Sequence, residues 1–151
     1  MQLQLRAPSY RFTHDCVVPA PRPEVRERLL DLEHYPDWWP QVRAVARIDD
    51  DNALVVCRST LPYDLELHLT ALRRDEDLLA VGIDGPIRGE ARWRLHDEGP
   101  DRTRLAYEQE VRVEAPLLRV ASLLARPLLE WNHARMMRGA EQGLAGAATH
   151  A

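Results

Sequence analysis

Acid and base groups alternate with leucine between residues 64 and 70. Because successive side chains of a β-strand point to opposite faces, a strand here has two unlike faces: one carries Leu65, Leu67 and Leu69, the other Asp64, Glu66, His68 and Thr70. A polar face turned to solvent is usual for an antiparallel sheet with one buried side. If that face were turned inward, Glu66 and His68 could transfer protons in a reaction. The alternation favours the solvated face and leaves the catalytic interpretation open.

Two aromatic residues with polar atoms, Trp93 and Tyr107, fall on the predicted inner faces of adjacent strands. Each combines a large apolar body with one hydrogen-bonding group. Such residues either pack a core or contact a ligand, and the sequence supports both roles equally.

Asn132 is the most informative polar residue of the C-terminal segment. It falls on the same helical stripe as Leu124 and Leu128, one turn before Arg135 and Met136. A buried amide has to be satisfied by the backbone, by water or by a ligand. An amide and a guanidinium near a flexible methionine would suit an apolar ligand with one oxygen-bearing end. In the alternative, Asn132 bonds a strand carbonyl and Arg135 lies exposed.

Other catalytic or metal-binding chemistry finds little support. None of the three serines lies in a Gly-x-Ser-x-Gly turn, and Cys16 and Cys57 are expected in the core because both fall in predicted strands. Glu130 and His133 have the spacing of di-iron bundles, which need two such pairs and two further glutamates. With one pair present, we expect an exposed helix turn, no metal site and no cofactor.

The composition is that of one globular domain. The chain has 151 residues, of which 45% are hydrophobic and 29% charged, and its net charge of −4 argues against a nucleic-acid partner. Its two cysteines are too few for a disulfide framework. No apolar run approaches the ~20 residues that cross a bilayer, and the first residues lack the apolar core of a signal peptide. The expected location is the cytoplasm.

Hydrophobic periodicity and turn signals predict the elements that position these residues. A strand at residues 10–18 is ended by the prolines that follow it, and a helix at 23–32 and a short helical turn at 35–39 come next. Turns short enough for hairpins then separate six strands. The six strands span residues 42–49, 53–60, 64–73, 78–84, 87–96 and 103–113. After Pro116 the apolar residues recur at helical spacing, and Gly143 and Gly146 are predicted to end this helix.

These elements predict an α+β fold with an internal cavity. The long helix needs a surface for its apolar stripe, and a strongly curved antiparallel sheet wrapped around it provides one. Curvature leaves space between sheet and helix unless large side chains fill it, and the chain has one phenylalanine and only glycine or alanine at positions 82, 85, 89 and 91. Residues 1–151 are expected to form a single domain with a frayed tail at about 145–151.

Five segments carry a family resemblance through their order and spacing. They are VPAPRPEV (18–25), LEHYPDWWP (32–40), DGPIRG (84–89) with Trp93, TRLAY (103–107), and Trp131-Asn132-His133 followed by Gly143-Leu144. Together they resemble the START-related (SRPBCC) superfamily, and within it the polyketide cyclase/dehydrase and lipid-transport group. The resemblance implies a helix-grip fold, a curved seven-stranded sheet around the C-terminal helix with a ligand cavity between them. Members bind lipids, sterols, quinones, hormones or polyketides and only some are enzymes, so no single reaction is implied.

We therefore expect a carrier or binding protein for a small hydrophobic molecule, such as a lipid, a polyketide or a quinone-like compound. The residues expected to border its cavity are Trp39, Trp93, Tyr107, Leu128, Asn132 and Met136. One alternative is a polyketide aromatase/cyclase or dehydratase in which Tyr107, His68 or Glu66 moves protons, and a second is a protein-interaction module. A desolvated histidine or glutamate beside Tyr107 would favour the enzyme. An apolar cavity would favour the carrier, and a filled cavity with an exposed apolar patch would favour the interaction module. The ligand and the choice between monomer and dimer stay open.

Overall fold

A computed structural model describes residues 9–58, 64–113 and 116–149, and their side chains except for those of 116–129 and 147–149. The chain begins with β1 (Ser9–Val18), α1 (Arg22–Leu30), η1 (Leu32–His34) and α2 (Tyr35–Trp38). Six strands follow: β2 (Val42–Arg47), β3 (Asn52–Arg58), β4 (Asp64–Arg74), β5 (Leu78–Asp84), β6 (Ile87–Asp97) and β7 (Thr103–Val113). The last element is the long helix α3 (Pro116–Thr149).

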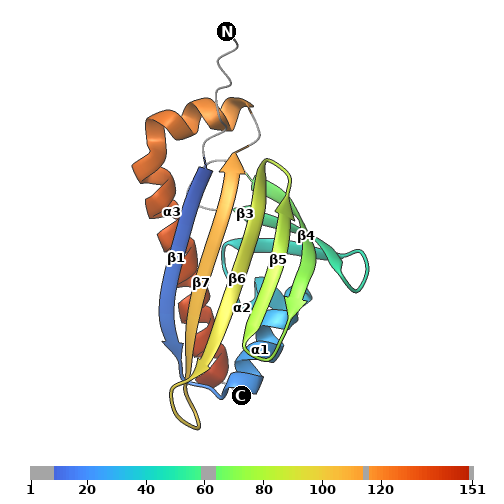
Figure 1. Ribbon diagram of the computed structural model, residues 1–151, viewed down its shortest axis with the longest axis vertical. Helices are drawn as coiled ribbons and strands as arrows, with labels where there is room; N and C mark the ends of the chain where they lie inside the picture. Colours follow the sequence, from blue (N-terminus) through green and yellow to red (C-terminus); the bar gives the residue numbers. More distant parts are fainter. Residues whose placement is uncertain (1–8, 59–63, 114–115, 150–151) are drawn as a thin grey trace.

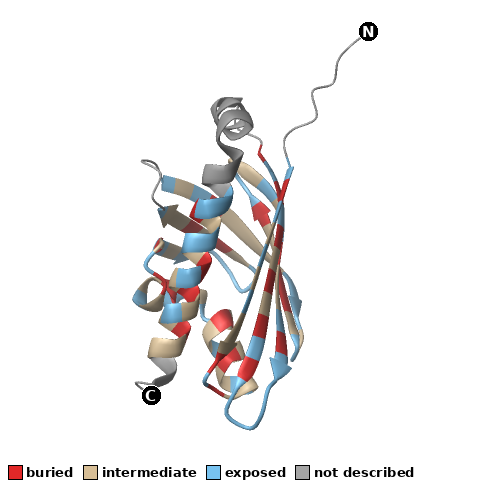
Figure 2. Cartoon of the chain, turned by 90° about the vertical axis from the view of Figure 1, so that its left-hand side faces the viewer, coloured by how far each residue is buried: buried red, intermediate tan, exposed pale blue. Residues whose placement is uncertain are grey.

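The described strands form one seven-stranded antiparallel sheet in the order β1-β7-β6-β5-β4-β3-β2. The strands from β2 to β7 make a meander, and β1 closes it by pairing with β7 along its whole length (Figure 1). Figure 2 shows the sheet and α3 as two layers, with α1 and α2 at one end between them. The predicted α+β class and helix-grip arrangement are confirmed.

The turn from β1 into α1 is set by proline. Pro21 takes an extended conformation at the N-cap, and Pro23 lies in the first helical turn, where its missing N–H costs no hydrogen bond. One side of this short helix buries Val25 and Leu29. They pack in a cluster with residues from the strand ends and from α3: Val18, Leu79, Leu95, Leu105 and Leu144. This cluster fills one end of the space between sheet and helix.

Helix α3 does not end where the sequence signals predict. It continues past Gly143 and Gly146 to Thr149, so the glycines do not act as a C-terminal cap. A Cβ at Gly143 would overlap the carbonyl oxygen of Trp38 in α2. Glycine is therefore needed at position 143 because two helices approach each other closely there, and not because the helix stops.

The corner at residues 35–39 packs against α3. The ring of Trp38 lies 4.8 Å from that of Tyr35 and 5.7 Å from that of Trp39, measured between centroids. The Trp39 indole N–H donates to the carbonyl oxygen of Met136 at 2.9 Å. This aromatic corner therefore fixes α2 to the middle of α3. Among the described helices, none is long and apolar enough to cross a membrane.

Candidate functional site: a cavity between the sheet and the long helix

A cavity of about 680 Å³ lies between the inner face of the sheet and α3. Its sheet side follows the two-residue period of the strands, since alternate side chains point inward. These lining residues are Leu65, Leu67 and Leu69 of β4, Val81 and Ile83 of β5, Ile87, Ala91 and Trp93 of β6, and Tyr107, Gln109, Val111 and Val113 of β7. The wall is therefore predominantly apolar.

Exposed charged residues mark the rim of the cavity. They belong to the turn between β2 and β3 and to the end of β4, and include Arg47, Asp49, Asp50, Asp51, Arg73 and Arg74. Arg74 Nη1 lies 2.8 Å from Asp51 Oδ1, which links the two segments. A predominantly apolar lining with a small number of polar groups is the general form of a small-molecule site.

The structure brings together five of the six residues expected at the cavity. Trp39, Trp93, Tyr107, Asn132 and Met136 all line it, whereas the side chain of Leu128 lies outside the described part of the chain. The centroid of the Trp93 ring is 6.3 Å from that of Trp39 and 4.5 Å from that of Tyr107. The three rings form a continuous aromatic surface.

Glu66 and His68 point away from this cavity. Their neighbours Leu65, Leu67 and Leu69 line it, so the two-residue period of β4 puts the polar residues on the other face. Glu66 is exposed, and His68 Nε2 lies 2.9 Å from Asn52 Oδ1. Neither is positioned to act on a molecule bound inside, and this removes two of the three residues that the cyclase alternative named.

Two cavity residues were not predicted. Gln109 was not singled out, and His133, expected with Glu130 on an exposed helix turn, is instead half-buried and lines the cavity. The Tyr107 hydroxyl donates to Gln109 Oε1, and His133 Nε2 donates to the same oxygen at 3.2 Å. Because a carbonyl oxygen can only accept, Nε2 carries the imidazole proton. The His133 ring also stacks on Phe12, with centroids 4.1 Å apart. We call Tyr107, Gln109 and His133 the polar cluster of the cavity wall.

Burial keeps the ionisable groups in this wall neutral. Desolvation, with a smaller effect of nearby His14, lowers the pKa of His133 to about 4. Desolvation also raises the pKa of Tyr107, and raises that of the Cys57 thiol to about 11. At neutral pH the wall therefore offers hydrogen-bonding groups but neither an imidazolium nor a thiolate.

Trp131 and Arg135 lie outside the site. Trp131 is 46% exposed. The exposed Arg135 guanidinium lies 5.7 Å above its ring centroid. Arg135 therefore does not contribute a charge to the cavity beside Asn132, as the sequence analysis allowed.

Comparison with known families supports this architecture. Residues 9–148 match the family described as polyketide cyclase/dehydrase and lipid transport. The chain belongs to this family. Because the match includes every strand, α1, α2 and nearly all of α3, it covers the whole cavity.

Solved structures show the same fold at low sequence identity. A START superfamily protein from Mycobacterium smegmatis is 17% identical, with a TM-score of 0.76 over 93% of this chain and 97% of that one. The Zhui aromatase/cyclase from Streptomyces sp. R1128 is 16% identical, with a TM-score of 0.77 over 94% of both chains. Norcoclaurine synthase from Thalictrum flavum is 16% identical, with a TM-score of 0.65 over 97% of this chain and 99% of that one. No curated protein matches the sequence.

Proposed function

We propose that this protein binds a small, predominantly apolar molecule with one oxygen-bearing end, and acts as its carrier or binding protein. The cavity is the observation that carries the proposal. Its volume of about 680 Å³ is within the range of small-molecule sites, roughly 300–1,000 Å³. Family membership supports the same class of ligand. The space is not filled, which argues against a module that acts only through its surface.

The lining suggests how the ligand lies. Apolar groups of Val55, Leu67 and Ile83 offer contacts to its hydrocarbon part, and the aromatic surface offers a flat face for a ring or a conjugated chain. Away from the charged rim, polar groups line the cavity on β7 and α3, at the polar cluster and at Asn132, which is 8% exposed. A ligand oxygen directed to this side would meet its hydrogen-bonding groups without burying a charge.

Binding can be tested with two substitutions at neighbouring positions of β6. Trp93 lines the cavity, whereas Arg94 is exposed on the other face. We expect Trp93→Ala to weaken binding of a fluorescent fatty-acid or naphthoquinone probe at least about tenfold, as the loss of a buried aromatic contact predicts. Arg94→Ala should bind like the parent. Equal affinities of Trp93→Ala and parent, or no saturable binding of either probe together with no ligand in native mass spectra, would contradict the proposal.

A second candidate is an enzyme that cyclises or dehydrates a polyketide-like substrate. His133 favours it, because a desolvated histidine lies beside Tyr107, with ring centroids 5.8 Å apart. Cyclisation needs chiefly orientation of the chain and one acid or base. However, an imidazole with a pKa of about 4 is a weak base at neutral pH, and its Nε2 proton is already donated to Gln109. Binding without turnover is therefore the better-supported function.

A further inference from the structure

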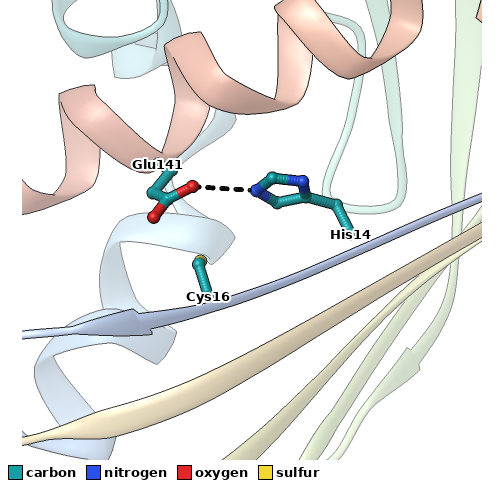
Figure 3. A group of neighbouring side chains, drawn as sticks. All are labelled: His14, Cys16 and Glu141. Atoms are coloured by element: carbon teal, nitrogen blue, oxygen red, sulfur yellow. Dashed lines mark hydrogen bonds and ion pairs between the residues drawn. The ribbon is translucent and has the colours of Figure 1, made fainter.

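Three metal-ligating side chains meet between β1 and α3. His14 and Cys16 are two residues apart in β1 and therefore share one face of that strand. Glu141 projects toward them from α3, as Figure 3 shows. His14 Nε2 lies 3.0 Å from Glu141 Oε2, and the imidazole nitrogen, the thiol sulfur and a carboxylate oxygen all lie within 4.8 Å of one another.

This cluster is separate from the ligand cavity. None of the three residues lines the cavity, although Tyr10 and Phe12 on the same face of β1 do. The cluster lies where the edge strand of the sheet contacts the long helix. His14 is 20% and Glu141 42% exposed at the side chain, so the site is partly buried and open to ions from solvent.

We propose that His14, Cys16 and Glu141 form a binding site for a divalent transition-metal ion of the zinc class. The donor set is the first reason, because imidazole, thiolate and carboxylate are the three protein ligand types of Zn²⁺, and a three-ligand site leaves a fourth position for water. Geometry is the second reason. Zinc–ligand bonds of about 2.0–2.3 Å place tetrahedral ligands roughly 3.3–3.7 Å apart, which side-chain movements of about 1 Å would achieve here.

The proton balance of binding follows from the present contacts. Burial, together with the carboxylates of Glu141 and Asp15, raises the pKa of the Cys16 thiol to about 12, so the thiol is protonated without metal. Coordination forms a metal–sulfur bond and releases this proton to solvent. His14 Nε2 now donates its proton to Glu141. To bind the ion through Nε2, the neutral ring gives this proton up to solvent and takes one up at Nδ1, so the imidazole adds no net proton to the balance. The thiolate and the carboxylate then balance the charge of the ion.

A bound ion would connect β1 to α3, two elements whose liganding residues are 127 positions apart in the chain. Because α3 forms one side of the cavity, the ion would stabilise the closed arrangement of helix and sheet. The expected role is structural, and binding to the folded state raises the melting temperature as metal concentration rises.

The test uses Co²⁺ as a spectroscopic probe on untagged protein freed of metal with a chelator. We expect saturation at one Co²⁺ per chain, with thiolate-to-metal charge-transfer absorption and the visible bands of tetrahedral cobalt. Zn²⁺ should displace the cobalt and raise the melting temperature. Cys16→Ser should abolish the charge-transfer band and the thermal shift.

Cys57→Ser is the matched control, because Cys57 is also a half-buried strand cysteine but lines the cavity instead. It should keep the band, whereas Glu141→Gln and His14→Gln should each weaken Co²⁺ binding at least about tenfold. Circular dichroism checks that each variant is folded. The proposal is overturned if the parent shows no saturable charge-transfer band, if folded Cys16→Ser keeps it, or if Cys57→Ser loses it.

Discussion

The partly buried His133 should make the stability of this protein fall in mildly acidic solution. An unfolded histidine has a pKa near 6.5, and in the fold burial lowers it to about 4. Between these values the unfolded chain binds a proton that the folded chain does not. Stability therefore rises with pH across this window and is lost as the pH falls from about 6.5 to about 4.

The size of the effect follows from the two pKa values. Each pKa unit corresponds to about 1.4 kcal/mol, so protonation at His133 should remove about 2 kcal/mol of unfolding free energy by pH 5 and about 3 kcal/mol by pH 4. Above pH 7 protonation of His133 no longer changes the free energy of unfolding, because the imidazole is neutral in both the folded and the unfolded state. The magnitude is a sizeable fraction of the about 5–15 kcal/mol that stabilise a typical domain.

The substitution His133→Gln isolates the pH dependence that comes from His133, because glutamine can still donate a hydrogen bond to Gln109 but does not titrate. Urea unfolding of parent and variant should be measured from pH 7.5 to pH 4. We expect the stability difference between them to move in favour of the variant by about 2 kcal/mol between pH 7 and pH 5. His96→Gln, at an exposed position of β6, controls for the loss of a histidine as such. A constant difference between His133→Gln and parent across this range would refute the placement of a neutral imidazole in the cavity wall.

Two further predictions concern packing and function. Gly143→Ala should lower the free energy of unfolding by about 1–3 kcal/mol in thermal or urea unfolding, because its Cβ would overlap the Trp38 carbonyl. Gly146→Ala is the control: its Cβ would meet nothing within 4 Å, so this substitution should be neutral or stabilising by up to about 1 kcal/mol. Equal effects of the two substitutions would contradict the close helix contact. If the protein only binds its ligand, neither the parent nor Tyr107→Phe should turn over a polyketide mimic. A loss of turnover of roughly 10²–10⁴-fold in Tyr107→Phe at unchanged probe affinity would establish the enzyme instead.

Much of the fold is predictable because its signals are local. The clearest alternation of apolar and polar residues is in β4 and β6, and Asp, Gly or Pro residues separate the strands β2 to β7 along the sequence. The predicted and observed bounds of these six strands differ by at most two residues. The end of α3 is different. Gly143 has the residue type of a C-cap, but the reason for it is the backbone of α2, which no local pattern in α3 can show.

The cavity was predicted partly for an incorrect reason. Gly82 lies between Val81 and Ile83, which line the cavity, so it faces the other way. Of the four small residues cited as facing inward, Ala91 alone is among the lining residues. Small side chains do contribute to the space, since Ala53, Ala71, Ala80 and Ala91 line it, but three of these were not among the residues cited. The extent of the cavity could be seen only once sheet and helix were placed together.

The polar cluster shows where sequence reasoning stops. Gln109 could have been found, since it follows Tyr107 by two residues on the same face of β7. His133 precedes the buried Met137 and Ala140 by four and seven residues, so helical spacing also points it inward. Its role depends on Phe12 and Gln109 from two different strands. Contacts between such distant segments are fixed by tertiary packing alone, as is the approach of His14 to Glu141.

The same burial that makes His133 notable separates the two functional hypotheses. A general base is most effective when its pKa lies near the working pH, and desolvation moves His133 well below it. An enzyme built on this residue would need its substrate to bring a negative charge close to the ring, because an opposite charge raises the pKa of imidazole. A carrier needs no such change, since a neutral, internally hydrogen-bonded wall can be covered by an apolar ligand without desolvating a charge.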